Sequence, residues 1–79
     1  MLIRVLFFGA AADAAATRAT TFEMADGAVV HDLISMLREN FPHLADLTLR
    51  SALNETHSHG SEPLTNGDEV AVFTPVSGG

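Results

Sequence analysis

The chain has 79 residues, enough for one small domain, because two domains would leave neither half enough residues to bury a core. Hydrophobic residues make up 47% of the chain and charged residues 18%, which is typical of a folded domain rather than a disordered one. The formal net charge of -6 argues against a nucleic-acid partner, whose phosphates would be repelled, and favours basic protein partners.

Two residue types are missing from the sequence. The chain contains no cysteine, which excludes a disulfide framework, a thiolate zinc site and a reactive thiol of its own, and it contains no lysine. The apolar start from Met1 to Phe8 is interrupted by Gly9 and lacks the long apolar core of a signal peptide. No segment approaches the roughly 20 apolar residues that span a bilayer. We therefore expect a cytoplasmic protein without a membrane partner.

Alternating apolar residues predict two strands in the first third of the chain. The first strand covers Leu2 to Phe8, with Ile3, Val5 and Phe7 on one face, and its nearly apolar second face predicts a central position in a sheet. The second strand covers Thr20 to Met24 and is followed by the turn residues of positions 25–27. The alanine-rich residues 9–18 between them fit either a loop or a short helical turn, because no apolar stripe anchors a helix there.

A helix is predicted over Val30 to Phe41. Apolar residues recur there at helical spacing, at Val30, Leu33, Ile34, Leu37 and Phe41. Pro42 lacks the amide donor that would continue the helix. Two short strands are predicted further on, at Ser51 to Thr56 and at Glu69 to Thr74, and Asn66-Gly67-Asp68 predicts a tight turn before the second of them. This order of elements predicts a small α+β domain with the helix packed across one sheet face.

The chain ends in Gly78 and Gly79, with no further element for this tail to join. Two glycines carry no side chains that would clash inside a narrow active-site channel. A carboxylate at such an end must be activated before it is transferred, usually as a mixed anhydride with a nucleotide phosphate. The chain has no glycine-rich phosphate loop and no lysine to complete one, so we expect the ATP site to lie on a partner.

The C-terminal residues 66–79, NGDEVAVFTPVSGG, resemble the C-terminal signature of the molybdopterin synthase small subunits, a family of ubiquitin-like sulfur carriers. Further similarity covers residues 3–8 with the family's first strand, residues 32–42 with its helix and residues 52–54 with its middle strand. The resemblance thus covers nearly the whole chain.

This resemblance implies a β-grasp (ubiquitin-like) domain with a mixed sheet over residues 1–74 and a flexible tail over residues 75–79. It implies that Gly79 is adenylated by an E1-like adenylating enzyme and converted to a thiocarboxylate with sulfur from a sulfur donor enzyme. The thiocarboxylate then donates its sulfur to cyclic pyranopterin monophosphate inside the molybdopterin synthase large subunit. The chain itself would be a non-catalytic subunit that binds no cofactor and leaves ATP to the activating partner.

Partner contacts are expected just before the terminal glycine, at Phe73, Pro75, Val76, Ser77 and Gly78. Strand alternation turns Phe73 away from Val72, so Phe73 is either an outward anchor for a partner or part of a second buried face. Pro75 would stiffen the exit of the tail or merely end the strand. Gly78 is the slender neighbour that lets Gly79 enter a partner.

Two positions invite comparison with the family. Val29 stands where the family often has a capping threonine, whose side chain would accept hydrogen bonds from the first helical amides. His57 stands where an apolar, partner-facing residue would be expected. His57 and His59 are two residues apart and would offer two metal ligands on one face of a strand, but without a third ligand we expect solvated histidines and no metal site.

Other functions remain open at this point. The chain could deliver sulfur to another product, such as the thiazole of thiamine or an amino acid. It could also be a ubiquitin-like protein modifier, although the absence of lysine excludes lysine-linked chains built on the protein itself. Finally, it could be a passive interaction domain whose terminal glycines are incidental.

Overall fold

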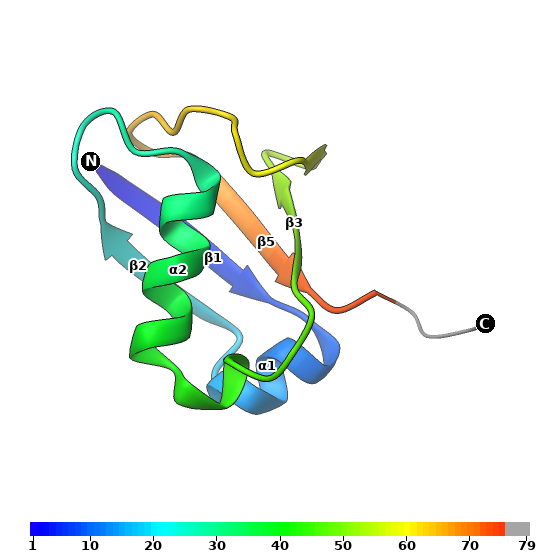
Figure 1. Cartoon of the computed structure of the whole chain (residues 1–79). Helices are drawn as coiled ribbons and strands as arrows, with labels where there is room; N and C mark the ends of the chain where they lie inside the picture. The colour runs from blue at the N-terminus through cyan, green and yellow to red at the C-terminus, as the bar shows by residue number, and fades with distance from the viewer. Residues whose placement is uncertain (76–79) are drawn as a thin grey trace.

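The structure, a computed structural model, describes residues 1–75 (Figure 1). Five strands form one mixed sheet in the order β2-β1-β5-β3-β4, in which β1 and β5 are parallel and the other neighbours are antiparallel. The strands are β1 (Leu2–Phe7), β2 (Ala19–Glu23), β3 (Arg50–Leu53), β4 (Thr56–Ser58) and β5 (Glu69–Phe73). The helices are α1 (Gly9–Ala15), α2 (Val30–Asn40) and the 3-10 helix η1 (Pro42–Leu44).

The first strand lies inside the sheet, as its two apolar faces predict. β1 pairs with β2 on one side and with β5 on the other. Ile3, Val5 and Phe7 are buried, whereas Leu2 on the opposite face is 54% exposed. The predicted alternation and central position are therefore confirmed.

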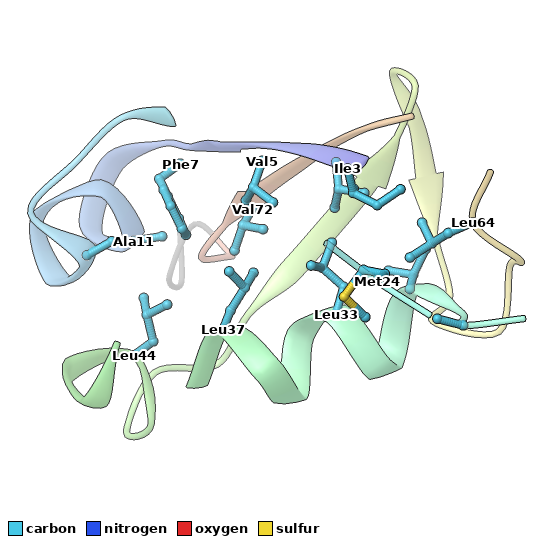
Figure 2. Close-up of a cluster of buried hydrophobic side chains, with 14 residues drawn as sticks. Ile3, Val5, Phe7, Ala11, Met24, Leu33, Leu37, Leu44, Leu64 and Val72 are labelled. Atoms are coloured by element: carbon cyan, nitrogen blue, oxygen red, sulfur yellow. The ribbon is translucent and has the colours of Figure 1, made fainter. Parts of the chain in front are cut away.

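The apolar stripe of α2 packs on the sheet (Figures 1 and 2). Val30, Leu33 and Leu37 are fully buried there together with Val70 and Val72 of β5. The helix ends at Asn40, and Pro42 begins η1 instead of a further turn. Phe41 lies against two aromatic rings, Phe7 at 5.5 Å and Phe22 at 6.3 Å between ring centres, both edge to face. The predicted helix is thus confirmed, with Phe41 as its cap.

The start of α2 is capped by a remote loop. Val29, at the N-cap, has no side-chain acceptor, but the amide of Val30 donates to the carbonyl oxygen of Glu62 at 3.0 Å and the amide of His31 to that of Gly60 at 2.8 Å. In addition, the carboxylate of Asp32 accepts the amide of Val29 at 2.8 Å. The first helical amides, which would otherwise lack partners, are therefore satisfied without the threonine of the family.

Glu62 holds the capping loop in shape. Its carboxylate accepts hydrogen bonds from the Ser58 hydroxyl at 2.6 Å and from the amides of His59 and Gly60 at 2.8 and 2.9 Å. Hydrogen bonds to this carboxylate lower the pKa of Glu62 from 4.5 to about 2. The Ser58 hydroxyl has the largest effect, followed by the backbone amides of His59, of Glu62 itself and of Gly60. A charged Glu62 is therefore part of the support for the start of α2.

The alanine-rich segment forms α1, the alternative that the sequence left undecided. Ala11 and Ala15 are buried in the core, where their small side chains let the helix approach the sheet closely. The helix ends at Ala15, and the cap residue Ala16 has a positive φ of 57°. Such a conformation is costly for a residue with a Cβ.

The predicted strand from Ser51 to Thr56 is wrong, because this segment is a hairpin. β3 ends at Leu53, the chain turns at Asn54 and Glu55, and β4 begins at Thr56. Both turn residues have positive φ, 48° and 70°, which reverses the chain. The side chain of Asn54 supports the turn by donating to Asp68 at 3.0 Å and accepting from the amide of Glu69 at 3.0 Å.

The predicted turn before the last strand is confirmed. Gly67 has a φ of 89°, and its amide donates to the carbonyl of Leu2 at 2.8 Å. The side chain of Asn66 accepts the amide of Leu2 at 2.8 Å. The carboxylate of Asp68 accepts hydrogen bonds from the side-chain amide of Asn54 and from the backbone amide of Thr65. These bonds, the first more than the second, lower the pKa of Asp68. The turn thereby fixes β5 beside β1.

Candidate functional site

The candidate site is the end of β5, where the chain leaves the sheet. β5 lies between β1 and β3, so it is held by ladders on both sides. Val70 and Val72 are fully buried on the face that α2 covers. Phe73 alternates to the other face and is half-buried, and Pro75 is exposed. Of the predicted site residues, Val76, Ser77, Gly78 and Gly79 lie outside the described residues.

A row of small and apolar residues lies across neighbouring strands on the sheet face opposite α2. Leu6 of β1, Ala71 of β5 and Ala52 of β3 are Cα partners in one row, and all three are half-buried. The row continues to His57 of β4, which is exposed. The position that would be apolar in the family therefore carries an imidazole at the edge of an otherwise apolar row.

Phe8 belongs to this site, although the sequence analysis did not select it. Its side chain is 51% exposed, and its amide donates to the carbonyl of Val72 at 3.0 Å, directly before Phe73 in the chain. A surface pocket of about 560 Å³ lies beside Phe8 and is lined in part by Leu6 and Ala12. The signal was present, because the alternation that buries Phe7 turns Phe8 to the same face as Leu6.

Charged residues frame the apolar row. Arg50 is the Cα partner of Phe73 and is exposed. Arg4 and Glu69, partners in the next row, form an exposed ion pair at 3.7 Å. Such an exposed pair contributes little to stability. The site therefore combines exposed aromatic area at the end of β5 with charges around it, a composition suited to protein recognition.

His57 and His59 lie near each other, with ring centres 6.0 Å apart. Across residues 1–75, no group of three His, Asp or Glu side chains is placed to hold a metal ion. In the same part of the chain, no helix combines the length and the apolar character required to cross a membrane.

Comparison with known proteins links this site to a family. The model of the ThiS family matches residues 5–79. The chain is 37% identical to the molybdopterin synthase sulfur carrier subunit of Chlamydomonas reinhardtii, over the full length of both chains. The molybdopterin synthase sulfur carrier subunit of Escherichia coli is 38% identical, over 99% of this chain and 100% of that protein.

Two solved structures resemble the fold over the full length of both chains. One is SAMP1 from Haloferax volcanii, with a TM-score of 0.89 and 25% identity. The other comes from a complex of subunits 1 and 2 of the molybdopterin-converting factor from Helicobacter pylori, with a TM-score of 0.74 and 26% identity. These likenesses confirm the expected β-grasp fold.

Proposed function

This chain belongs to the ThiS family, and on that premise we propose that it is the sulfur-carrier subunit of a molybdopterin synthase. The observation that carries the proposal is the full-length similarity to proteins named as that subunit, which includes the terminal glycines. The domain that we assign to residues 1–74 would present the tail of residues 75–79 to partner enzymes.

The proposed reaction takes place at the carboxylate of Gly79. An E1-like adenylating enzyme joins this carboxylate to AMP from ATP and releases pyrophosphate. A sulfur donor enzyme then supplies sulfur at the oxidation level of sulfide, which attacks the acyl carbon, displaces AMP and leaves a thiocarboxylate. When the sulfur passes to cyclic pyranopterin monophosphate, an oxygen atom from water restores the carboxylate. The chain needs no cofactor of its own in this cycle, and the ATP that it depends on suggests the cytoplasm as its location.

The proposed partner for the last step is the molybdopterin synthase large subunit. The similarity to subunit 1 or 2 in the Helicobacter pylori complex supports such a pairing. Phe8 and Phe73 flank the end of β5, so they would anchor the large subunit beside the point where the tail departs. Pro75, Val76, Ser77 and Gly78 would then line the entry into its active site, with Gly78 providing the narrowest backbone.

The amino-acid composition supports the proposal that partner enzymes activate the carboxylate of Gly79. A chain without cysteine has no persulfide of its own to offer, and a chain without lysine lacks the charge of a nucleotide-binding phosphate loop. The sulfur and the ATP energy must therefore both come from outside. Gly79 acts in this scheme as a substrate that is passed between enzymes.

Mass spectrometry of the C-terminus tests the proposal. After co-expression with the adenylating enzyme and the sulfur donor, we expect the mass of one oxygen-to-sulfur exchange on the peptide that contains Gly79. A variant that lacks Gly79 provides the matched control and should stay unmodified. An unchanged mass in the full-length chain would contradict the proposal.

Reconstitution separates this pathway from its alternatives. The thiocarboxylate form, mixed with the large subunit and cyclic pyranopterin monophosphate, should lose its sulfur and yield the dithiolene product. Sulfur loss only to a thiazole or amino-acid acceptor would point to another pathway. High-mass conjugates that depend on Gly79 would instead indicate a protein modifier.

A further inference from the structure

Asn66 is the one asparagine of the chain that precedes a glycine, because Asn40 precedes phenylalanine and Asn54 precedes glutamate. The side-chain amide of an asparagine can be attacked by the backbone nitrogen of the next residue. Glycine hinders that attack least, since it has no Cβ and its backbone adopts conformations that other residues resist. Asn66 and Gly67 are both exposed, so water and base reach them. This pair therefore has the chemistry and the access that deamidation requires.

Deamidation at this pair is a substitution within the chain. The backbone nitrogen of Gly67 gives its proton to a solvent base and bonds to the side-chain amide carbon of Asn66. The side-chain nitrogen takes up a proton and leaves as ammonia, and a five-membered succinimide ring remains. Water then opens the ring at either carbonyl, which leaves aspartate or isoaspartate at position 66. The reaction needs water and base, but no oxidant and no cofactor.

Leu2 holds both reacting groups in the folded chain. Its amide donates to the side-chain oxygen of Asn66 at 2.8 Å, and its carbonyl oxygen accepts the amide of Gly67, also at 2.8 Å. Loss of the Gly67 proton would leave a negative nitrogen facing a carbonyl oxygen, which is electrostatically unfavourable. The bond to the Asn66 oxygen restrains the rotation of the side chain that ring closure requires. Leu2 thus restrains the nucleophile and the electrophile together.

The turn around these two residues is itself held in one conformation. The amide of Asp68 donates to the carbonyl oxygen of Thr65 at 3.1 Å, which closes a four-residue turn with Gly67 at its third position and a φ of 89°. The carboxylate of Asp68 accepts the amide of Thr65 at 2.8 Å and its hydroxyl at 3.0 Å. The peptide unit between Asn66 and Gly67 is therefore bonded on both flanks as well as to Leu2.

The bonds to Leu2 can open without unfolding of the whole domain. Leu2 is the first residue of β1 and lies next to the chain end. Beyond it, Met1 is bonded to Met24 through its ammonium group and through its carbonyl oxygen, both at 2.8 Å. Chain ends open at a smaller free-energy cost than core strands do. Detachment of this end of β1 releases both Leu2 bonds at once.

We propose that Asn66 is a deamidation site that is closed while Leu2 is bonded to the turn and becomes reactive when the start of β1 detaches. The isoaspartate product would route the backbone through the former side chain and lengthen it, so the bond from the Arg4 amide to the Asp68 carbonyl would lose its register. The aspartate product would add a negative charge near the Asp68 carboxylate. Both changes disfavour the turn that fixes β5 beside β1. The proposal rests on this turn and does not depend on the sulfur-transfer proposal.

Incubation of the full chain at mildly alkaline pH tests the site. Trypsin makes its last cut after Arg50, so the fragment of residues 51–79 carries both Asn54 and Asn66. Fragmentation in the mass spectrometer then assigns the amide-to-acid mass change to one of them. We expect conversion at Asn66 ahead of Asn54, about tenfold or more slower in the folded chain than in the same chain in guanidinium chloride. Equal rates in the two states, or faster conversion at Asn54, would overturn the proposal.

Two variants at Leu2 test the restraint. Leu2→Pro removes the amide donor to Asn66 at the first position of a strand, where proline is tolerated, and should speed deamidation of the folded chain by about fivefold or more. Leu2→Ala shortens an exposed side chain but keeps the amide, so its rate should stay within about twofold of the parent rate. Circular dichroism establishes that each variant is folded. A parent-like rate for Leu2→Pro would contradict the proposal.

A core variant and hydrogen exchange separate this local opening from global unfolding. Leu37→Ala weakens the core but keeps both Leu2 bonds, so it should deamidate more slowly than Leu2→Pro in native buffer. In the parent chain, the protection of the Gly67 amide from exchange should match the ratio of unfolded to folded deamidation rates within about threefold. This comparison needs no substitution and holds even where Leu2→Pro fails to fold. A clear mismatch, or equal rates for Leu37→Ala and Leu2→Pro, would refute the role of Leu2.

Discussion

The hydroxyl of Ser58 donates a 2.6 Å hydrogen bond to the carboxylate of Glu62, within the loop whose carbonyl groups cap α2. The bond links the inner face of β4 to the start of the main helix. It also ties the shape of that loop to the ionisation of one side chain, because a carboxylate accepts these hydrogen bonds better than a neutral acid does.

Glu62 should make stability dependent on pH at the acid end. Its folded pKa of about 2 lies below the ordinary 4.5, so its contribution is present above 4.5 and is lost as pH falls toward 2. Urea unfolding of Glu62→Gln across this range should show a deficit at neutral pH that disappears near pH 2. Glu55→Gln, which removes an exposed carboxylate outside the loop, is the matched control. A deficit that stays constant with pH would contradict the assignment.

Asn54 should be the most sensitive exposed residue of the β3–β4 turn. Asn54→Ala loses two hydrogen bonds and puts alanine, which tolerates a positive φ less well than asparagine, at a φ of 48°, so we expect a loss of about 2 kcal/mol in unfolding free energy. Asn54→Gly loses the same bonds but accepts the backbone angle, so it should be the less destabilised variant. Urea denaturation measures both. If glycine proves worse than alanine, the backbone is not the source of the difference.

Ala16 offers a stabilising substitution. Its positive φ of 57° at the end of α1 suits glycine, so Ala16→Gly should raise the unfolding free energy by about 0.5–1 kcal/mol. For a domain of this size, each kcal/mol corresponds to roughly 4–8 °C in Tm, which calorimetry resolves. Ala14→Gly, inside the same helix, should lower stability by about 1 kcal/mol. A fall in Tm for both variants would argue against the strained cap.

Phe8 and Phe73 should dominate binding of the proposed large subunit. Truncation of either to alanine removes aromatic area beside the tail and should weaken the complex by about tenfold or more in calorimetric titration. Leu2→Ala provides the control, because Leu2 is 54% exposed on the same sheet face but at the opposite end of β1. Circular dichroism of each variant before titration separates lost binding from lost folding. If Leu2→Ala weakens binding as much, the docking surface is not centred on the tail.

The elements with a strong hydrophobic period could be predicted from the sequence, and those held by tertiary contacts could not. β1 and α2 combine several apolar residues at a regular spacing, and Asn66-Gly67 has a specific turn chemistry. α1 shows no apolar stripe, because it is built of alanines that become buried only through their neighbours. The β3–β4 hairpin has a strand of three residues and turns at Asn54-Glu55 without glycine, so its period and its turn are both weak signals.

The same distinction between local patterns and tertiary contacts applies to the residues of the candidate site. Alternation next to two buried valines predicts the sheet face of Phe73, and that face is confirmed, whereas its role as a partner anchor stays a prediction. Phe8 carries the same alternation signal at the end of the predicted strand. Apart from Asp32, whose carboxylate accepts the amide of Val29, the cap on α2 had no local signal, because its acceptors, the carbonyls of Gly60 and Glu62, lie some thirty residues further along the chain.

The position of β5 also determines how the molecule responds to a mechanical pull. A force applied through Pro75 enters a strand that is paired on both sides, with β1 and with β3. The force runs along these ladders, so their hydrogen bonds bear it in shear and share it, whereas an edge strand such as β4 would peel away one bond at a time. At the far end of β5, the backbone amide of Arg4 donates to the carbonyl oxygen of Asp68, and the backbone amide of Asn54 donates to that of Glu69. These two hydrogen bonds anchor the strand there. A partner that drew in the chain end would therefore pull against a strand that is held on both sides.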